Sequence, residues 1–145
     1  MRTIASPTTG PRPSAPPLRW GRIIAGAFLL ELLLLVTLVP IGLAFGMPGV
    51  PGATDYTVFF IAVPIGAFLG GVAAGAWVSR PLAANRALHG LLTGVGATLI
   101  YLGLCMTQPG SIAGVIAGYG PTLFWASQAL RIAGPIVGAK WRPRR

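Results

Sequence analysis

Long apolar runs, each about the length of a membrane-crossing helix, constrain this sequence more than any other feature. Short links rich in glycine, proline or arginine separate four such runs, at residues 23–45, 57–78, 87–106 and 121–140. A helix of about 20 residues spans the hydrocarbon core of a bilayer, because each residue adds about 1.5 Å. We therefore predict an all-α integral membrane protein whose four-helix bundle occupies residues 19–141.

The scarcity of charge supports the membrane class. Only 9% of the 145 residues are charged, with 11 Lys and Arg against 2 Asp and Glu, whereas soluble domains average roughly a quarter. Residues 1–18 are rich in proline, serine and threonine, and we predict a disordered tail there. Residues 142–145 form a short basic tail. The first apolar run is too long for a cleaved secretory signal, and we expect it to remain as the first span.

The last apolar stretch, residues 111–139, has two interpretations because Gly118-Tyr119-Gly120-Pro121 interrupts it. Proline suits the first turn of a helix, which favours a fourth span beginning at Pro121 and a short preceding segment at the outer surface. The alternative is a single long, tilted helix with a kink at Pro121.

Basic residues predict the orientation of the chain. Ten of them flank the ends of the runs that would share one side of the membrane: Arg2, Arg12, Arg19, Arg22, Arg80, Arg86, Lys140, Arg142, Arg144 and Arg145. The links at 46–56 and 107–110 contain no Lys or Arg. The positive-inside rule then places both termini on the cytoplasmic side of the inner membrane. The net charge of +9 therefore indicates topology and contact with anionic lipid head groups, and not nucleic-acid binding.

Aromatic residues are predicted at both membrane–water boundaries, where amphipathic rings concentrate. Three tryptophans fall at the cytoplasmic boundary, and three tyrosines fall near the outer one: Trp20, Trp77 and Trp141, then Tyr56, Tyr101 and Tyr119.

Glycines four residues apart predict where helices approach one another, because helices in lipid associate through close contact at small residues. Four such pairs occur in the second, third and fourth spans: Gly66 and Gly70, Gly71 and Gly75, Gly90 and Gly94, and Gly134 and Gly138. They serve packing inside the bundle, an interface with another subunit, or both on different faces. The leucine-rich part of the first span, Phe28–Leu38, has no such pair, and apart from Glu31 most of it is predicted to face lipid.

Glu31 and Arg131 are charged residues inside predicted spans. Glu31 lies 11 positions after Trp20, and Arg131 lies 10 positions before Trp141, so both are about 15 Å from the same boundary. Each charge costs roughly 2.5–3.5 kcal/mol at that depth, and an ion pair would lower the cost. Gln128, one helical turn from Arg131, would complete the site.

This polar site has three possible roles. The pair could lock the first and fourth spans together, or Arg131 could reach toward the cytoplasm and leave Glu31 alone. In the third interpretation, Glu31 binds and releases protons or a cationic substrate, although a permanent arginine partner would keep the carboxylate ionised.

The remaining polar residues do not form a catalytic or metal site. Cys105 is the single cysteine, so the chain has neither an intrachain disulfide nor a Cys/His cluster that would hold a metal. Asp55 is predicted to cap the second span, and His89 is predicted to be a polar group at the membrane edge. With its two acidic residues at different depths, the chain is predicted not to be an enzyme, and no cofactor is assigned.

Residues 70–104 contain Gly70-Gly71-Val-Ala-Ala-Gly75, a basic loop, and His89-Gly90-Leu-Leu-Thr-Gly94 before an apolar run. This stretch resembles a group of small uncharacterised bacterial membrane proteins with four spans and a glycine-rich central hairpin. The resemblance implies a four-span fold and no residue roles. Glu31 is also similar to the mid-membrane glutamate of small multidrug transporters, whose weak charge bias this chain does not share.

From these features we expect a non-enzymatic multi-pass membrane protein that acts through lateral helix contacts. It would be an accessory or structural subunit of a membrane complex, or a self-associating bundle. Its partners would be membrane lipids and other membrane-protein subunits or a second copy of itself, and not nucleic acid. The alternative is a small proton- or cation-coupled transporter that uses Glu31.

Overall fold

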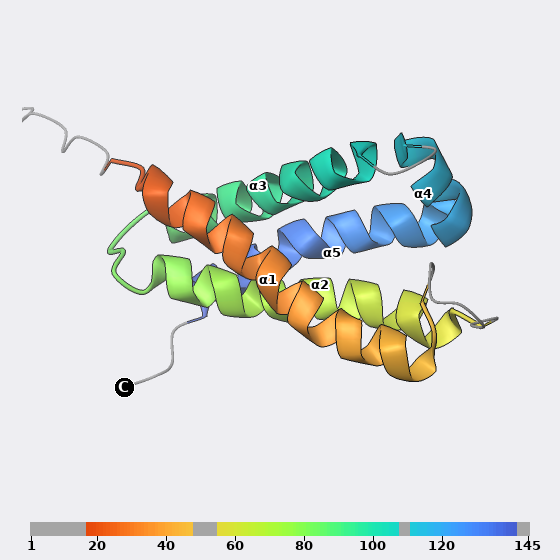
Figure 1. Cartoon of the computed structure of the whole chain (residues 1–145). Helices are drawn as coiled ribbons and strands as arrows, with labels where there is room; N and C mark the ends of the chain where they lie inside the picture. The colour runs from red at the N-terminus through yellow and green to blue at the C-terminus, as the bar shows by residue number, and fades with distance from the viewer. Residues whose placement is uncertain (1–16, 48–54, 108–110, 142–145) are drawn as a thin grey trace, which may run out of the picture.

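The computed structural model describes residues 17–47, 55–107 and 111–141, and every regular element in these ranges is a helix (Figure 1). The helices are α1 (Trp20–Phe45), α2 (Thr57–Ser79), α3 (Arg86–Met106), α4 (Ser111–Tyr119) and α5 (Pro121–Lys140). The predicted all-α class is confirmed, and the predicted spans match α1, α2, α3 and α5 to within three residues at each end. The predicted tails at 1–18 and 142–145 lie outside the described residues, apart from Pro17 and Leu18.

Three helices, α1, α2 and α3, are long and apolar enough to cross a membrane. Large apolar side chains cover their outer faces, including Phe28, Leu32 and Val36 on α1, Ile61 and Leu69 on α2, and Leu99 on α3. A soluble protein rarely exposes such continuous apolar faces. The chain therefore has the architecture of a multi-pass membrane protein. α5 has 20 residues but is less apolar than the other three.

The helices lie roughly lengthwise beside one another, with α5 against α2 and α3, and α1 crossing over α2 and α3 (Figure 1). One end of the bundle holds the beginnings of α1 and α3 and the ends of α2 and α5. The described basic residues outside the helix interiors belong to that end: Arg19, Arg22, Arg80, Arg86 and Lys140. The opposite end holds α4 and the end of α1 (Figure 1).

A break at Gly120 separates α4 from α5. Gly120 has a φ of 77°, a conformation that side-chain-bearing residues rarely adopt, and Pro121 follows in the first turn of α5. The structure therefore has two helices here, as in the first interpretation of residues 111–139, and not one kinked helix.

Glycines on α2 and α5 bring these two helices into backbone contact. A methyl group built on Gly138 would lie 2.7 Å from the carbonyl carbon of Val72 and 2.9 Å from the amide nitrogen of Ala76. One built on Gly71 would lie 3.2 Å from the Cα of Gly134. Because these neighbours are backbone atoms, they cannot rotate away as a side chain can. The close approach of α2 and α5 therefore depends on the missing side chains.

The contact between α3 and α5 is built in the same way. A methyl group on Gly94 would lie 2.7 Å from the Cα of Ile132. The carbonyl carbon of Pro135 would lie 2.9 Å from a methyl group on Gly90 of α3, and 2.7 Å from one on Gly75 of α2. Pro135 of α5 is therefore held between the backbones of both neighbouring helices.

The remaining glycine pair faces α1 and is less crowded. A methyl group on Gly66 would lie 3.1 Å from a side-chain carbon of Leu34, which has rotational freedom. On Gly70, the nearest atom would be the Cβ of Leu33 at 3.6 Å, an ordinary contact distance. The four glycine pairs thus differ in how much space surrounds them.

Candidate functional site

Glu31 of α1 and Arg131 of α5 form an ion pair inside the bundle. Arg131 Nε lies 3.4 Å from Glu31 Oε1, and the two side chains are 1% and 11% exposed for Arg131 and Glu31 respectively. Their mutual attraction offsets part of the cost of removing both charges from water. Arg131 is buried beside Glu31 and does not reach toward the basic end of the bundle, which removes the interpretation in which Glu31 is left alone.

Two further side chains contact the Arg131 guanidinium. Gln128, one turn earlier on α5, accepts a hydrogen bond from Arg131 Nη1 at 3.3 Å. The ring of Tyr101 on α3 lies against the guanidinium, with 4.1 Å between Arg131 Cζ and the ring centroid, a favourable cation–π arrangement. Arg131 thus connects α1, α3 and α5 through a single side chain.

Hydrogen bonding in this polar site is incomplete. Glu31 Oε1, Arg131 Nε and Gln128 Nε2 are buried, and none of the three makes a hydrogen bond within the described part of the chain. A buried polar atom without a hydrogen bond costs about 1–3 kcal/mol. Glu31 Oε1 and Arg131 Nε still face each other across the 3.4 Å ion pair, so the unused hydrogen-bonding capacity of this site lies mainly at Gln128 Nε2.

The tyrosines have inward contacts that their positions in the sequence do not reveal. Tyr101, predicted at the outer boundary, has its ring against Arg131. The ring of Tyr119 packs on Phe60 with 4.6 Å between centroids, and Tyr56 approaches the same ring edge-on at 6.0 Å. Phe60 therefore ties the beginning of α2 to the end of α4.

The tryptophans predicted at the cytoplasmic boundary all lie at the basic end of the bundle. Trp20 and Trp141 are more exposed than Trp77. The side chain of Arg22 lies over the Trp77 ring, with 4.7 Å between Cζ and the centroid. It also donates hydrogen bonds to the carbonyl oxygens of Trp77, at 2.9 Å, and Val78, at 3.3 Å. Arg22 thereby satisfies carbonyls near the end of α2 and fixes α1 beside it.

His89 is the polar residue whose role the sequence reasoning missed. It is predicted at the membrane edge, yet only 1% of it is exposed. Its Nε2 accepts a hydrogen bond from the Arg19 backbone N–H at 3.2 Å, and its Nδ1 lies 2.9 Å from the carbonyl oxygen of Asn85. A carbonyl can only accept, so Nδ1 carries the proton and the ring is neutral. His89 therefore fastens the beginning of α1 to α3.

Asp55 and Cys105 occupy simpler surroundings. Asp55 Oδ1 accepts a hydrogen bond from the Thr57 backbone N–H at 2.8 Å, at the beginning of α2, and hydrogen bonding with Thr57 lowers the pKa of the Asp55 carboxyl below its ordinary value. Cys105 is a buried free thiol. In residues 17–47, 55–107 and 111–141, no three His, Cys, Asp or Glu side chains lie close enough together to hold a metal ion.

No known protein family, no characterised protein and no solved structure matches this chain.

Proposed function

We propose that the protein spans the inner membrane four times, through α1, α2, α3 and α5, with both ends of the chain in the cytoplasm. The position of α5 supports a fourth span, because it runs beside two of the three apolar helices, α2 and α3, and turns its charged Arg131 inward to Glu31 of α1. The described residues of the end that holds α4 include no Lys or Arg, whereas five basic residues belong to the other end. The positive-inside rule assigns the basic end to the cytoplasm.

In this membrane, the protein acts as an accessory or structural subunit that binds another membrane helix, from a partner or from a second copy. The observation that carries this proposal is the outward face of α5. Thr122, Ala126 and Ala129 are exposed there at helical spacing, and Trp125 flanks them with its ring exposed. Small residues offer little surface to lipid chains but allow a second backbone to approach closely. The outer faces of α1, α2 and α3 carry more large apolar side chains, which suit lipid, whereas α5 exposes Leu123, Trp125 and Val137.

The buried ion pair gives α5 its orientation in this proposal. With Arg131 held by Glu31, Gln128 and Tyr101, the opposite side of the helix must point away from the bundle. Pro135 between the two neighbouring backbones opposes rotation of α5. The polar site therefore has a structural role, which is to present the face around Ala126 and Ala129.

Purification from the native membrane in mild detergent tests the proposal. We expect the chain to bring a membrane protein, or a second copy of itself, in a fixed ratio. Ala126→Leu combined with Ala129→Leu should reduce this ratio strongly, because the larger side chains separate the two helices. Ala73→Leu is the matched control, since Ala73 is exposed on α2. A wild-type chain that remains monomeric and without a partner would refute the proposal.

A proton- or cation-coupled transporter that uses Glu31 is the second candidate. The buried atoms Glu31 Oε1 and Gln128 Nε2, which make no hydrogen bonds among the described residues, favour it because a translocated ion or proton needs polar atoms inside the membrane. Purified protein in sealed vesicles decides between the two functions. Transport that Glu31→Gln abolishes, with helix content unchanged, would replace the subunit proposal, and the absence of transport would exclude the transporter.

A further inference from the structure

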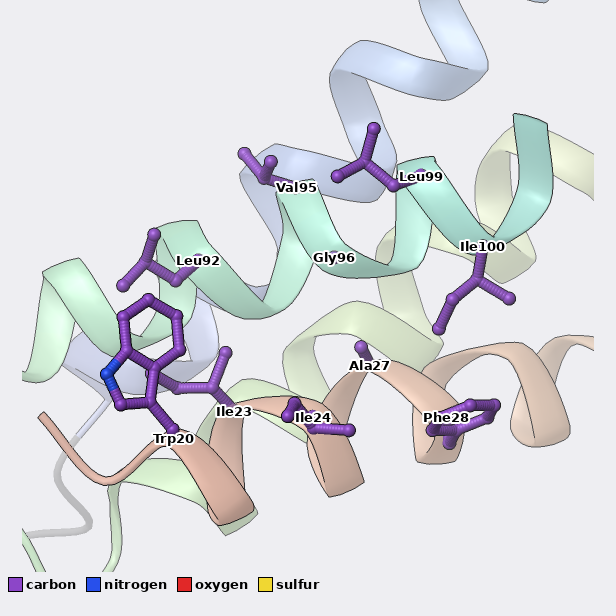
Figure 2. A pocket seen from close by; sticks show the side chains of 10 residues that line it. All are labelled: Trp20, Ile23, Ile24, Ala27, Phe28, Leu92, Val95, Gly96, Leu99 and Ile100. Carbon is purple, nitrogen blue, oxygen red and sulfur yellow. The ribbon is translucent and has the colours of Figure 1, made fainter. Parts of the chain in front are cut away.

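A shallow apolar groove of about 330 Å³ runs along the surface between α1 and α3 (Figure 2). Its floor includes Gly96 and Ala27, whose small size leaves the space open, and a methyl group on Gly96 would lie 3.3 Å from the Ala27 Cβ. Large side chains of both helices form its walls, among them Trp20, Ile24, Phe28, Leu92, Val95 and Leu99. The groove has the size of a small ligand site and apolar walls.

One end of this groove reaches the basic end of the bundle. Trp20 stands there across from Leu92 (Figure 2) and is 57% exposed. Arg19, the residue before it, is exposed, and its backbone N–H donates to His89 Nε2 of α3 at 3.2 Å. This hydrogen bond holds Arg19 where α1 and α3 meet, at the mouth of the groove. The two acidic residues of the chain lie elsewhere, Glu31 in the interior and Asp55 at the opposite end.

We propose that the groove binds one anionic phospholipid, with an acyl chain along the apolar walls and the phosphate beside Arg19 and Trp20. This inference rests on the membrane placement under Proposed function. Lipid chains surround every span, so burial of a chain in the groove gains little by itself. The preference for an anionic lipid comes from Arg19 at the mouth of the groove, because a basic residue near the membrane surface attracts anionic head groups. A bound helix could cover the apolar walls but would leave the charge of Arg19 unmatched.

Fluorescence quenching of Trp20 tests the site. The other tryptophans are changed to phenylalanine: Trp77→Phe, Trp125→Phe and Trp141→Phe. The protein is placed in phosphatidylcholine vesicles that contain a minor fraction of a lipid brominated on its acyl chains. This brominated lipid is phosphatidylglycerol in one sample and phosphatidylcholine in the other. We expect the brominated phosphatidylglycerol to quench Trp20 more strongly than an equal amount of brominated phosphatidylcholine.

Two pairs of variants separate the groove from general attraction to a basic surface. Arg19→Gln should lower the preference for phosphatidylglycerol about fivefold, whereas Arg80→Gln, in the exposed link at the same end, should leave it unchanged. Val95→Phe narrows the groove and should also reduce quenching. Leu104→Phe on α3, exposed and not among the groove residues, should not.

Other results of these experiments would each contradict a particular part of the proposal. Equal quenching by the two brominated lipids, or equal effects of Arg19→Gln and Arg80→Gln, would refute the lipid site and leave the α5 interface untouched. Quenching of Trp20 by aqueous acrylamide and by neither lipid would refute the membrane placement itself. Trp20 shielded from all three quenchers, with Ile24→Cys cross-linking two chains in a Cys105→Ser background, would show that a second copy fills the groove.

Discussion

One added methyl group at Gly138 tests the close contact between α2 and α5. In Gly138→Ala, the new carbon would lie 2.7 Å from the carbonyl carbon of Val72 and 2.9 Å from the amide nitrogen of Ala76. Contacts below 3 Å are repulsive, and both neighbours belong to the backbone of α2. The two helices must therefore separate along their shared surface to admit the methyl group.

The expected loss of folding stability in Gly138→Ala is the difference between two opposing effects. Overpacking costs about 1–3 kcal/mol, and we expect the upper part of that range because the obstacle is backbone. Alanine in place of glycine favours a helix by about 1 kcal/mol, so the net destabilisation should be about 2 kcal/mol. Gly70→Ala is the matched control, since its methyl group meets nothing closer than 3.6 Å. It should be neutral or stabilising by up to about 1 kcal/mol.

Reversible unfolding in mixed micelles, with sodium dodecyl sulfate as denaturant and helix content as signal, measures both free energies. The two variants should differ by about 2–3 kcal/mol, with Gly138→Ala the less stable. Equal stability of Gly138→Ala and Gly70→Ala would refute the argument that α2 and α5 touch through their backbones.

Three further predictions address the polar residues. Glu31→Gln leaves a buried charge on Arg131 and should cost about 3–5 kcal/mol, and Glu31→Arg with Arg131→Glu should recover much of the stability that each single variant loses. No recovery in unfolding experiments would argue against direct contact. His89→Phe removes the acceptor of the Arg19 N–H and should speed hydrogen exchange at that amide, and nitrogen-15 NMR of the wild type should show a neutral ring protonated at Nδ1; a ring protonated at Nε2 would contradict the assigned hydrogen bonds. Because hydrogen bonding with Thr57 lowers the pKa of Asp55 in the folded state, its contribution is complete above the ordinary carboxyl range and is lost as the pH falls through the lowered value. Protection of the Thr57 amide, measured as its hydrogen exchange relative to the intrinsic rate at each pH, should therefore fall in acid, and Asp55→Ala should remove this loss of protection; an unchanged acid response in that variant would exclude the carboxyl as its cause.

The helix bounds and the depth of the ion pair can be predicted from this sequence. The apolar runs end beside charged residues, as at Arg80, Arg86 and Lys140, or beside the Gly120-Pro121 break, so the ends of α1, α2, α3 and α5 lie close to the predicted positions. Depth along a helix is a matter of counting residues. Counting residues from Trp20 to Glu31 and from Trp141 to Arg131 gives the two charged residues nearly the same depth. In the structure, Arg131 Nε lies 3.4 Å from Glu31 Oε1.

Rotation of the helices about their axes could not be predicted. The pairs Gly66 and Gly70, and Gly71 and Gly75, look alike in the sequence, yet Gly70 has room for a methyl group and Gly75 has none. The difference depends on which neighbour each face meets. The same is true of Tyr101, whose ring contacts Arg131, because a position near a helix end does not say which way a side chain points.

The hydrogen bond between His89 and Arg19 could not be predicted for a different reason. It joins a side chain to a backbone N–H 70 residues away, and a backbone donor leaves no trace in the amino-acid sequence. The only available signal was an isolated histidine in an otherwise apolar helix.

In the proposed four-span topology, the burial of Arg131 has a consequence for how the chain enters a bilayer. α5 is the least apolar of the long helices, and an arginine at its centre would meet bare hydrocarbon if it entered alone. The ribosome makes α5 after α1, α2 and α3, so Glu31 and the glycine-bearing surfaces of α2 and α3 precede it. In that topology the earlier helices provide a site for α5, and a chain cut before residue 121 would keep the Glu31 carboxylate in the membrane without its arginine partner.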